Sequence, residues 1–233
     1  AVDLIFENRK IKGVRLENGQ DVLGERVILA TGGASYSFTG SDAAGINLAR
    51  KLGHAIVPLR AGLIPLMIKQ DYIKKLEGLT LHNIKLKFSD GKTDIVSDIG
   101  ELLFTAFGIS GPLVISASGK VVDLLFQSKK VYLEIDLKPG LSAQLLDSRL
   151  LREFKVNAKK NVKNMLKNLL PLNLITIFTQ VSGIDPFKKC SQVTQKEREK
   201  IVSLLKGFHL DISGARPIEE GMITRGGVSL KEI

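Results

Sequence analysis

The sequence has very few residues of the kinds that crosslink a chain or hold a metal. Cys190 is the one cysteine in 233 residues, and tryptophan is absent. A single cysteine excludes an internal disulfide framework and a cysteine-rich metal site, and it fits a reducing, cytoplasmic compartment. The three histidines, His54, His82 and His209, stand at no spacing that metal sites use, so we expect no metal.

Signal peptides and long apolar runs are also missing. The run "LLPLNLITIF" is too short to cross a bilayer and is interrupted by Pro171 and Asn173, so we expect no membrane partner. The hydrophobic fraction of 44% is nevertheless enough to build a core. The formal net charge of +10 suits an anionic ligand, although solubility accounts for most of such charge.

Both standard phosphate-binding fingerprints are absent. The chain contains neither G-x-G-x-x-G nor G-x-x-x-x-G-K-[ST]. Either the protein binds no dinucleotide, or the fingerprint precedes Ala1. The chain begins and stops in the middle of a pattern, so we expect an internal fragment of a longer protein.

The residues that are present predict an α/β segment at the start. Alternating Val14 and Leu16 before Asn18-Gly19 predict a β-hairpin. The apolar run at 26–30, "RVILA", predicts a short buried strand ending at Thr31. A helix capped at 41–42 should follow and end at 53.

The middle of the chain changes character twice. Residues 63–137 read mostly as β-strands, with one helix that begins after Ser110 and has Pro112 in its first turn; this pattern predicts a small barrel or sandwich. Residues 141–206 read as helical, with a capping box at Thr194 and Glu197. One apolar stripe recurs at helical spacing, and it consists of Val162, Met165, Leu166, Leu169 and Leu170.

This layout is that of an insertion in a larger α/β domain. We expect a first α/β segment at 1–60 and a barrel-like module at 61–140 and 207–222. A helical module should occupy 141–206, and 223–233 should return to the first segment.

Three glycine-containing stretches are candidates for ligand contact. After a strand, Gly32 and Gly33 would let the backbone pass close to a ligand, although strands often end in Gly-Gly without one. The stretch "GELLFTAFGISGPLVIS" (100–116) leads into a helix N-terminus, and a tight turn explains it equally well. In "TRGGVSLKEI" (224–233), Arg225 and Lys231 offer charge to a ligand or simply to solvent.

The helical module is basic. Residues 149–171 contain one acid, Glu153, and seven basic residues: Arg149, Arg152, Lys155, Lys159, Lys160, Lys163 and Lys167. This pattern fits a nucleic-acid surface. However, no aromatic residue interleaves with lysines 159–167, and these lysines lie opposite the apolar stripe. We therefore favour a solvated helix face and keep a nucleic-acid or protein binding module without a redox role as the alternative.

Taken in order, "VILATGGASYSFTGSDAAG", "GELLFTAFGISGP" and "ITRGGVSLKEI" resemble the bacterial conserved flavoproteins described as NAD(P)/FAD-dependent oxidoreductases, a group that includes aminoacetone oxidase-like enzymes. The resemblance covers essentially the whole chain. It implies a partial glutathione-reductase-type FAD-binding domain with an inserted small β-barrel and a helical module. It also implies that the family's G-x-G-x-x-G and a last flavin-binding segment lie outside 1–233.

The resemblance also implies residue roles. By position, Thr31, Gly32 and Gly33 would approach FAD, and the flavin ring would face Thr224, Gly226, Gly227 and Val228. The substrate cavity would be lined by Phe104, Thr105, Gly108, Ser110 and Gly111. No catalytic residue is assignable.

The chain departs from the family pattern at two places. The family usually reads Phe-Thr-His where this chain has Ala106 after Phe104-Thr105, so a possible acid or base is missing. The stretch after the first glycine pair also differs from the family. Family members often have glycine or an acidic residue and an aromatic residue there, and this chain has Ala43, Ala44 and Ile46.

The expected function is that of an FAD-dependent oxidoreductase acting on a small molecule. Hydride would pass from the substrate to flavin N5, with NAD(P)H or oxygen as the second partner. This chain alone should bind FAD poorly and be inactive, because the pyrophosphate loop is absent. The substrate and the oligomeric state are not assignable from the sequence.

Overall fold

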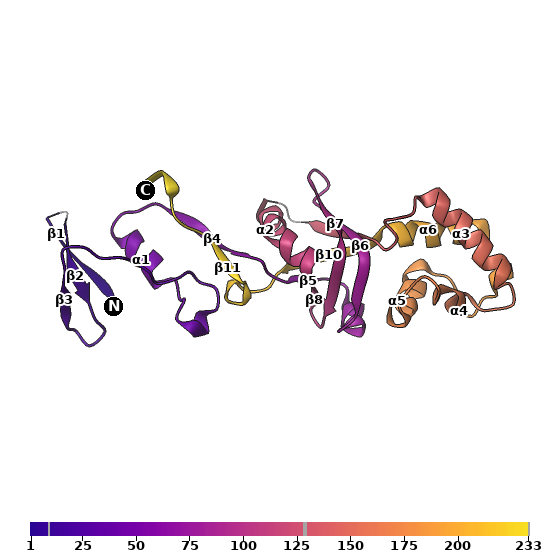
Figure 1. The fold of residues 1–233 in the computed structure, drawn as a ribbon, viewed down its shortest axis with the longest axis horizontal. Coiled ribbons are helices and arrows are strands. Elements are labelled where there is room, and N and C mark those ends of the chain that lie inside the picture. The colour runs from indigo at the N-terminus through magenta and orange to yellow at the C-terminus, as the bar shows by residue number, and fades with distance from the viewer. Residues whose placement is uncertain (9, 128–129, 233) are drawn as a thin grey trace. The chain divides into compact units, whose positions relative to one another are not determined.

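The computed structural model describes residues 1–8, 10–127 and 130–232 (Figure 1). The chain divides into two compact units. Unit 1 consists of Ala1–Leu63 and Pro217–Ile233, and unit 2 consists of Ile64–Arg216. No helix in the described ranges combines the length and the apolar character that a membrane crossing requires.

The described residues of unit 1 form two small antiparallel sheets and one α-helix. Strands β1 (Asp3–Glu7), β2 (Lys10–Arg15) and β3 (Asp21–Leu23) form a sheet in the order β1-β2-β3. The predicted hairpin joins β2 to β3, with Gly19 at a φ of 83°. The second sheet pairs β4 (Ile56–Gly62) with β11 (Ile223–Val228). Short 3-10 turns lie at Ser37–Thr39, Ile218–Glu220 and Leu230–Glu232.

Helix α1 (Ala44–Lys51) follows the glycine pair and confirms the predicted helix. The Asp42 carboxylate accepts a hydrogen bond of 2.9 Å from the backbone N–H of Ala44, so it satisfies one of the helix's first free donors. Gly53 follows the helix at a φ of 95°, a left-handed conformation that glycine adopts without strain.

The strand predicted for "RVILA" is wrong. Residues 26–30 carry no strand, and Ile28 is 90% exposed. An extended apolar segment becomes a strand only where a neighbour accepts its backbone hydrogen bonds, and no strand in the described residues pairs with this one.

Unit 2 is built on a closed barrel of six strands in the order β10-β5-β8-β7-β6-β9, which confirms the predicted barrel. The strands are β5 (Leu66–Ile68), β6 (Thr80–Ser89), β7 (Asp94–Thr105), β8 (Gly108–Ser110), β9 (Val131–Asp136) and β10 (Phe208–Ala215). A 3-10 segment, Asp71–Leu76, follows β5. Alternate residues of β9, among them Leu133 and Ile135, are fully buried, as the period of two requires.

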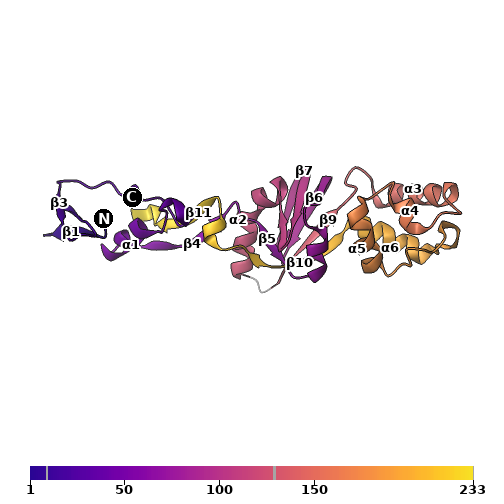
Figure 2. The same cartoon turned by 90° about the horizontal axis from the view of Figure 1, so that it is seen from below.

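Helix α2 (Pro112–Gln127) packs against β7, and four helices are inserted between β9 and β10 (Figures 1 and 2). They are α3 (Ala143–Val156), α4 (Val162–Leu166), α5 (Leu172–Ser182) and α6 (Gln195–Lys206). Another 3-10 turn lies at Cys190–Gln192.

One hydrophobic core runs through the barrel and the four helices. It joins Phe88 and Phe104 of the barrel to Phe154 and Phe178 of the helices. The apolar stripe predicted at 162–170 is buried in it, with exposures of 0–6%. At the end of the barrel, the Lys206 ammonium lies 2.6 Å from an Asp136 carboxylate oxygen. The barrel and the helices therefore form one unit with a shared core.

The predicted capping box begins α6. The Thr194 hydroxyl accepts from the backbone N–H of Glu197, and the Glu197 carboxylate accepts from the backbone N–H of Thr194 at 2.8 Å. The same carboxylate lies 2.8 Å from the Lys188 ammonium. The Lys188 hydrogen bond, and then the Thr194 amide, lower the pKa of Glu197.

We therefore expect Glu197→Gln to destabilise the protein by about 1 kcal/mol at pH 7, because a charged partner of Lys188 is lost. The folded pKa lies below the unfolded one, so this stabilisation is full above the unfolded pKa and is lost as the pH falls through the folded pKa. Urea unfolding at pH 7 and pH 3 measures the effect. The gap between wild type and variant should narrow as the pH falls from 7 to 3. The exposed Glu199→Gln is the control, and a gap that stays constant contradicts the assignment.

Candidate functional site

The two Gly-Gly segments of the sequence meet in unit 1. The side-chain oxygen of Thr224, on β11, accepts hydrogen bonds from the backbone N–H groups of Ala34 at 2.8 Å and Ser35 at 3.0 Å. It also lies 3.0 Å from the Ser35 hydroxyl. One side chain therefore holds the loop after Gly32-Gly33 against β11, across a sequence separation of 190 residues.

The first glycine pair is required by this packing. Gly32 has a φ of 72°, and a Cβ there would lie 2.6 Å from the Ser41 hydroxyl. A Cβ on Gly33 would overlap the side chain of Thr224. The backbone carbonyl of Gly33 accepts from the N–H of Ala43, the residue before α1. Close packing alone thus explains why glycine stands at both positions.

The second glycine pair forms an irregularity in β11. Gly226 and Gly227 have φ values of 94° and 105°, and the register with β4 shifts between Arg225 and Gly227. A Cβ on Gly226 would overlap the carbonyl of Pro58. Val228 pairs with Ile56. The irregularity changes the direction of the β11 backbone next to the loop that Thr224 holds.

The donors left over in this region suit an anionic or carbonyl-bearing ligand. In the described part of the chain, the backbone N–H groups of Gly32 and Gly33 have no hydrogen-bond partner. Thr31 is exposed beside them. Arg225 pairs with Arg60 in the register of β4 and β11. The residues present therefore fit one part of a phosphate or flavin-edge site. We use the name glycine junction for the following residues: Thr31, Gly32, Gly33, Thr224, Gly226 and Gly227.

The insert motif belongs to unit 2, whereas the glycine junction belongs to unit 1. Phe104 is 1% exposed and belongs to the barrel core. Gly108 lies in β8, where a Cβ would overlap the carbonyl of Leu66. Ser110 pairs with Leu103, and Gly111, at a φ of 94°, accepts from the N–H of Ile115 in α2.

Thr105 is the residue of this motif whose side-chain hydroxyl lacks a hydrogen-bond partner among the described residues. Its side-chain oxygen is buried and has no hydrogen-bond partner in the described residues. Such a group costs free energy unless something completes it. Lining of a substrate cavity by this motif stays a prediction.

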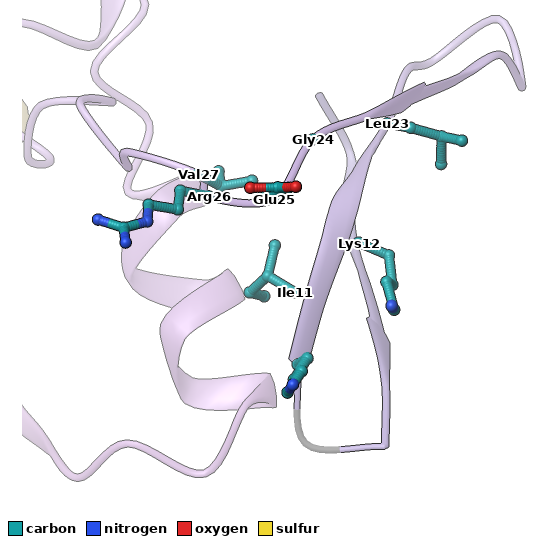
Figure 3. Close-up of a pocket in the computed structure, with 8 residues that line it drawn as sticks. Ile11, Lys12, Leu23, Gly24, Glu25, Arg26 and Val27 are labelled. Carbon is teal, nitrogen blue, oxygen red and sulfur yellow. The ribbon is translucent and has the colours of Figure 1, made fainter.

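Two open hollows, one in each unit, are lined by none of the predicted site residues. One, of about 960 Å³ in unit 1, is bounded by residues 10–12 of β2 and residues 23–27 (Figure 3). Figure 3 shows Ile11 and Val27 on its two sides. The other, of about 540 Å³ in unit 2, includes Tyr72 and Asp211. Neither contains a residue of the glycine junction.

A polar cluster at the second hollow was not found from the sequence. The Gln70 amide donates to an Asp211 carboxylate oxygen at 2.9 Å, and the N–H of Asp211 donates back to Gln70 at 3.1 Å. His209 lies 3.2 Å from the other oxygen. Burial, and then the Asp211 charge, raise the pKa of Tyr72. The His209–Asp211 spacing of two residues along a strand was its one sequence signal.

The described residues contain no group of three or more His, Cys, Asp or Glu side chains that could hold a metal ion. Each histidine lies beside a single carboxylate, and these are Glu232, Glu101 and Asp211. Cys190 is 2% exposed, and burial raises the pKa of its thiol, so it is poorly suited to act as a nucleophile.

Residues 60–223 match the family described as "HI0933-like protein barrel and H2TH domain". The chain is 27% identical over 220 residues to the 3-dehydro-bile acid delta(4,6)-reductase of Clostridium scindens, covering 93% of this chain and 53% of that protein. It is 26% identical over 216 residues to the ribosomal RNA dihydrouridine synthase of Escherichia coli, covering 93% and 51%. The Haemophilus influenzae protein of the same name is 25% identical over 234 residues, covering 100% and 55%. The chain thus spans about half the length of the curated relatives it matches.

Proposed function

Because the chain belongs to the family of HI0933-like proteins, we propose that it supplies one part of the FAD site and the barrel-and-helix insert of an FAD-dependent oxidoreductase. The partial flavin domain would be of the glutathione-reductase type. The observation that carries the proposal is the Thr224 hydroxyl, which joins two Gly-Gly segments of otherwise separate parts of the sequence. Glycines that let the backbone come close to a phosphate are one part of a dinucleotide-binding site.

The chain's own residues would position the cofactor and leave the redox step to it. The N–H groups of Gly32 and Gly33 are the donors that would face FAD, and Thr224 would keep them aimed. Gly226 and Gly227 would let the β11 backbone come close to the ring. A bound flavin supplies hydride transfer.

The names of the relatives favour reduction as the direction of that transfer. One relative is named as a reductase of a bile acid, and two are named as dihydrouridine synthases. Dihydrouridine differs from uridine by two added hydrogens at one carbon–carbon bond. We therefore propose hydride delivery to one carbon of a conjugated double bond, with a proton from solvent added to the other carbon, in place of removal of hydride from the substrate. NAD(P)H would be the source of electrons.

The proposal is tested by titrating FAD against this chain and against any longer reading frame that contains it, with flavin fluorescence quenching as the readout. We expect stoichiometric binding by the longer protein and weak or no binding by this chain, because no pyrophosphate loop lies in its sequence. Absence of binding in both would sink the proposal. A stoichiometric flavin on this chain alone would overturn the expectation that the site is divided.

A further inference from the structure

Two lysine-rich segments of the helical region are held side by side. The backbone N–H of Val162 donates to the backbone carbonyl of Lys188 at 2.9 Å, and the N–H of Lys163 donates to the carbonyl of Pro186 at 3.1 Å. In the opposite direction, the backbone N–H of Cys190 donates to the backbone carbonyl of Lys160 at 3.0 Å. We name this pairing of residues 158–163 with 184–191 the lysine clasp. These backbone hydrogen bonds hold the two segments next to each other.

The lysine clasp carries an exposed aromatic ring. Phe187 is 61% exposed, and the Lys163 ammonium lies 4.1 Å from the centre of its ring. This cation–π contact orients the ring. Most of the ring surface remains open to a second flat group. The ring comes from a loop that follows α5, so it is not visible as an aromatic among lysines 159–167.

The charge of the lysine clasp is mostly uncompensated. Lys159, Lys160 and Lys189 are exposed, whereas Lys188 is occupied by Glu197. Asp185 is the one acid in residues 183–189, and one of its oxygens accepts from the N–H of Phe187 at 2.9 Å. The two paired segments therefore contain three exposed lysines and an exposed aromatic ring, with a positive balance of charge.

We propose that the lysine clasp binds single-stranded nucleic acid, with Lys159, Lys160 and Lys189 at backbone phosphates and one base stacked on Phe187. Lysines supply the electrostatic part of such binding, and an aromatic face supplies stacking that every base can use. A duplex offers no free base face in its interior, so single strands are preferred. The proposal does not depend on the flavin site.

The test is fluorescence anisotropy of the full chain with fluorescein-labelled twelve-nucleotide oligouridylate, oligothymidylate and a duplex of the same length. We expect single strands to bind and the duplex to bind more weakly. Affinity should fall by about 20-fold between 50 and 200 mM salt if about three phosphates are contacted. The two single strands distinguish RNA from DNA as the source of the same chemistry.

Variants assign the binding to the clasp. Phe187→Ala should weaken binding by about 5-fold or more, and Phe187→Tyr should retain it. The triple variant Lys159→Glu, Lys160→Glu, Lys189→Glu should abolish most of the salt dependence. The matched control changes the exposed Lys74, Lys92 and Lys120 to Glu, which alters the net charge equally. Equal losses in both triple variants, an unchanged affinity in Phe187→Ala, or tighter binding of polyglutamate than of oligonucleotide would each overturn the proposal.

Discussion

Replacing Phe104 with alanine is expected to lower the free energy of unfolding of unit 2 by about 3–5 kcal/mol. The ring is 1% exposed within the core that the barrel shares with the helices. Its backbone N–H donates to Leu79 and its carbonyl accepts from Gly78, so the surrounding chain is fixed and cannot collapse into the cavity. The measurement is urea unfolding of the full chain, with hydrogen exchange of the barrel amides as the local readout.

Two further variants make this result interpretable. Phe104→Leu retains most of the volume and should cost less than about 1.5 kcal/mol. Phe126, in α2 of the same unit, is 65% exposed, and its change to alanine should cost less than about 1 kcal/mol. A small effect for Phe104→Ala together with weakened substrate binding would instead favour the substrate cavity that the family resemblance implies.

Replacing Thr224 with valine is expected to release the loop that carries Gly32 and Gly33. Valine has the shape of threonine but offers no acceptor, so the N–H groups of Ala34 and Ser35 lose their partner. A lost partner costs about 1–3 kcal/mol for a group that stays shielded from water. Hydrogen exchange at these two amides should therefore quicken by about 10- to 100-fold. In a form of the protein that binds FAD, the affinity should fall by a similar factor.

The controls separate the hydroxyl from general damage. Thr224→Ser keeps the acceptor and should leave the exchange of both amides slow. Gly33→Ala brings a Cβ onto Thr224 and should open the same contact, whereas Gly24→Ala, whose nearest neighbour would lie at 3.6 Å, should not. Because Gly33 and Thr224 act through one contact, their effects should not add. Unchanged exchange in Thr224→Val would mean that the glycine junction is held by something else.

Much of the fold was predictable because its signals are local. Alternation of apolar and polar residues marked the long strands β6 and β7, and Asn18-Gly19 marked a turn that requires a positive φ. The capping box of α6 is complete within four consecutive residues. Several such strands close together in the sequence predicted a small barrel or sandwich, and the strand pairing of the structure is that of a closed barrel.

The strand prediction for "RVILA" was wrong because strand formation there depends on a neighbour far away in the sequence. Its composition is that of a buried strand, but a strand needs a neighbour, and its apolar residues give no information about whether one is present. In the structure Ile28 is exposed and the segment is unpaired among the described residues. The prediction used a local signal for a property that is not local.

The sequence by itself determined which regions are rich in strands and which are helical, that a helical region interrupts a small barrel or sandwich, and which segments contain the glycine pairs. It did so because periodicity, caps and turns act over a few residues. Only the tertiary structure decided that Thr224 holds the loop of Gly33, that Phe104 lies in the core, and that Phe187 joins the lysines of another segment. These relations depend on hydrogen bonds and packing between residues far apart in the chain, and no local pattern encodes them.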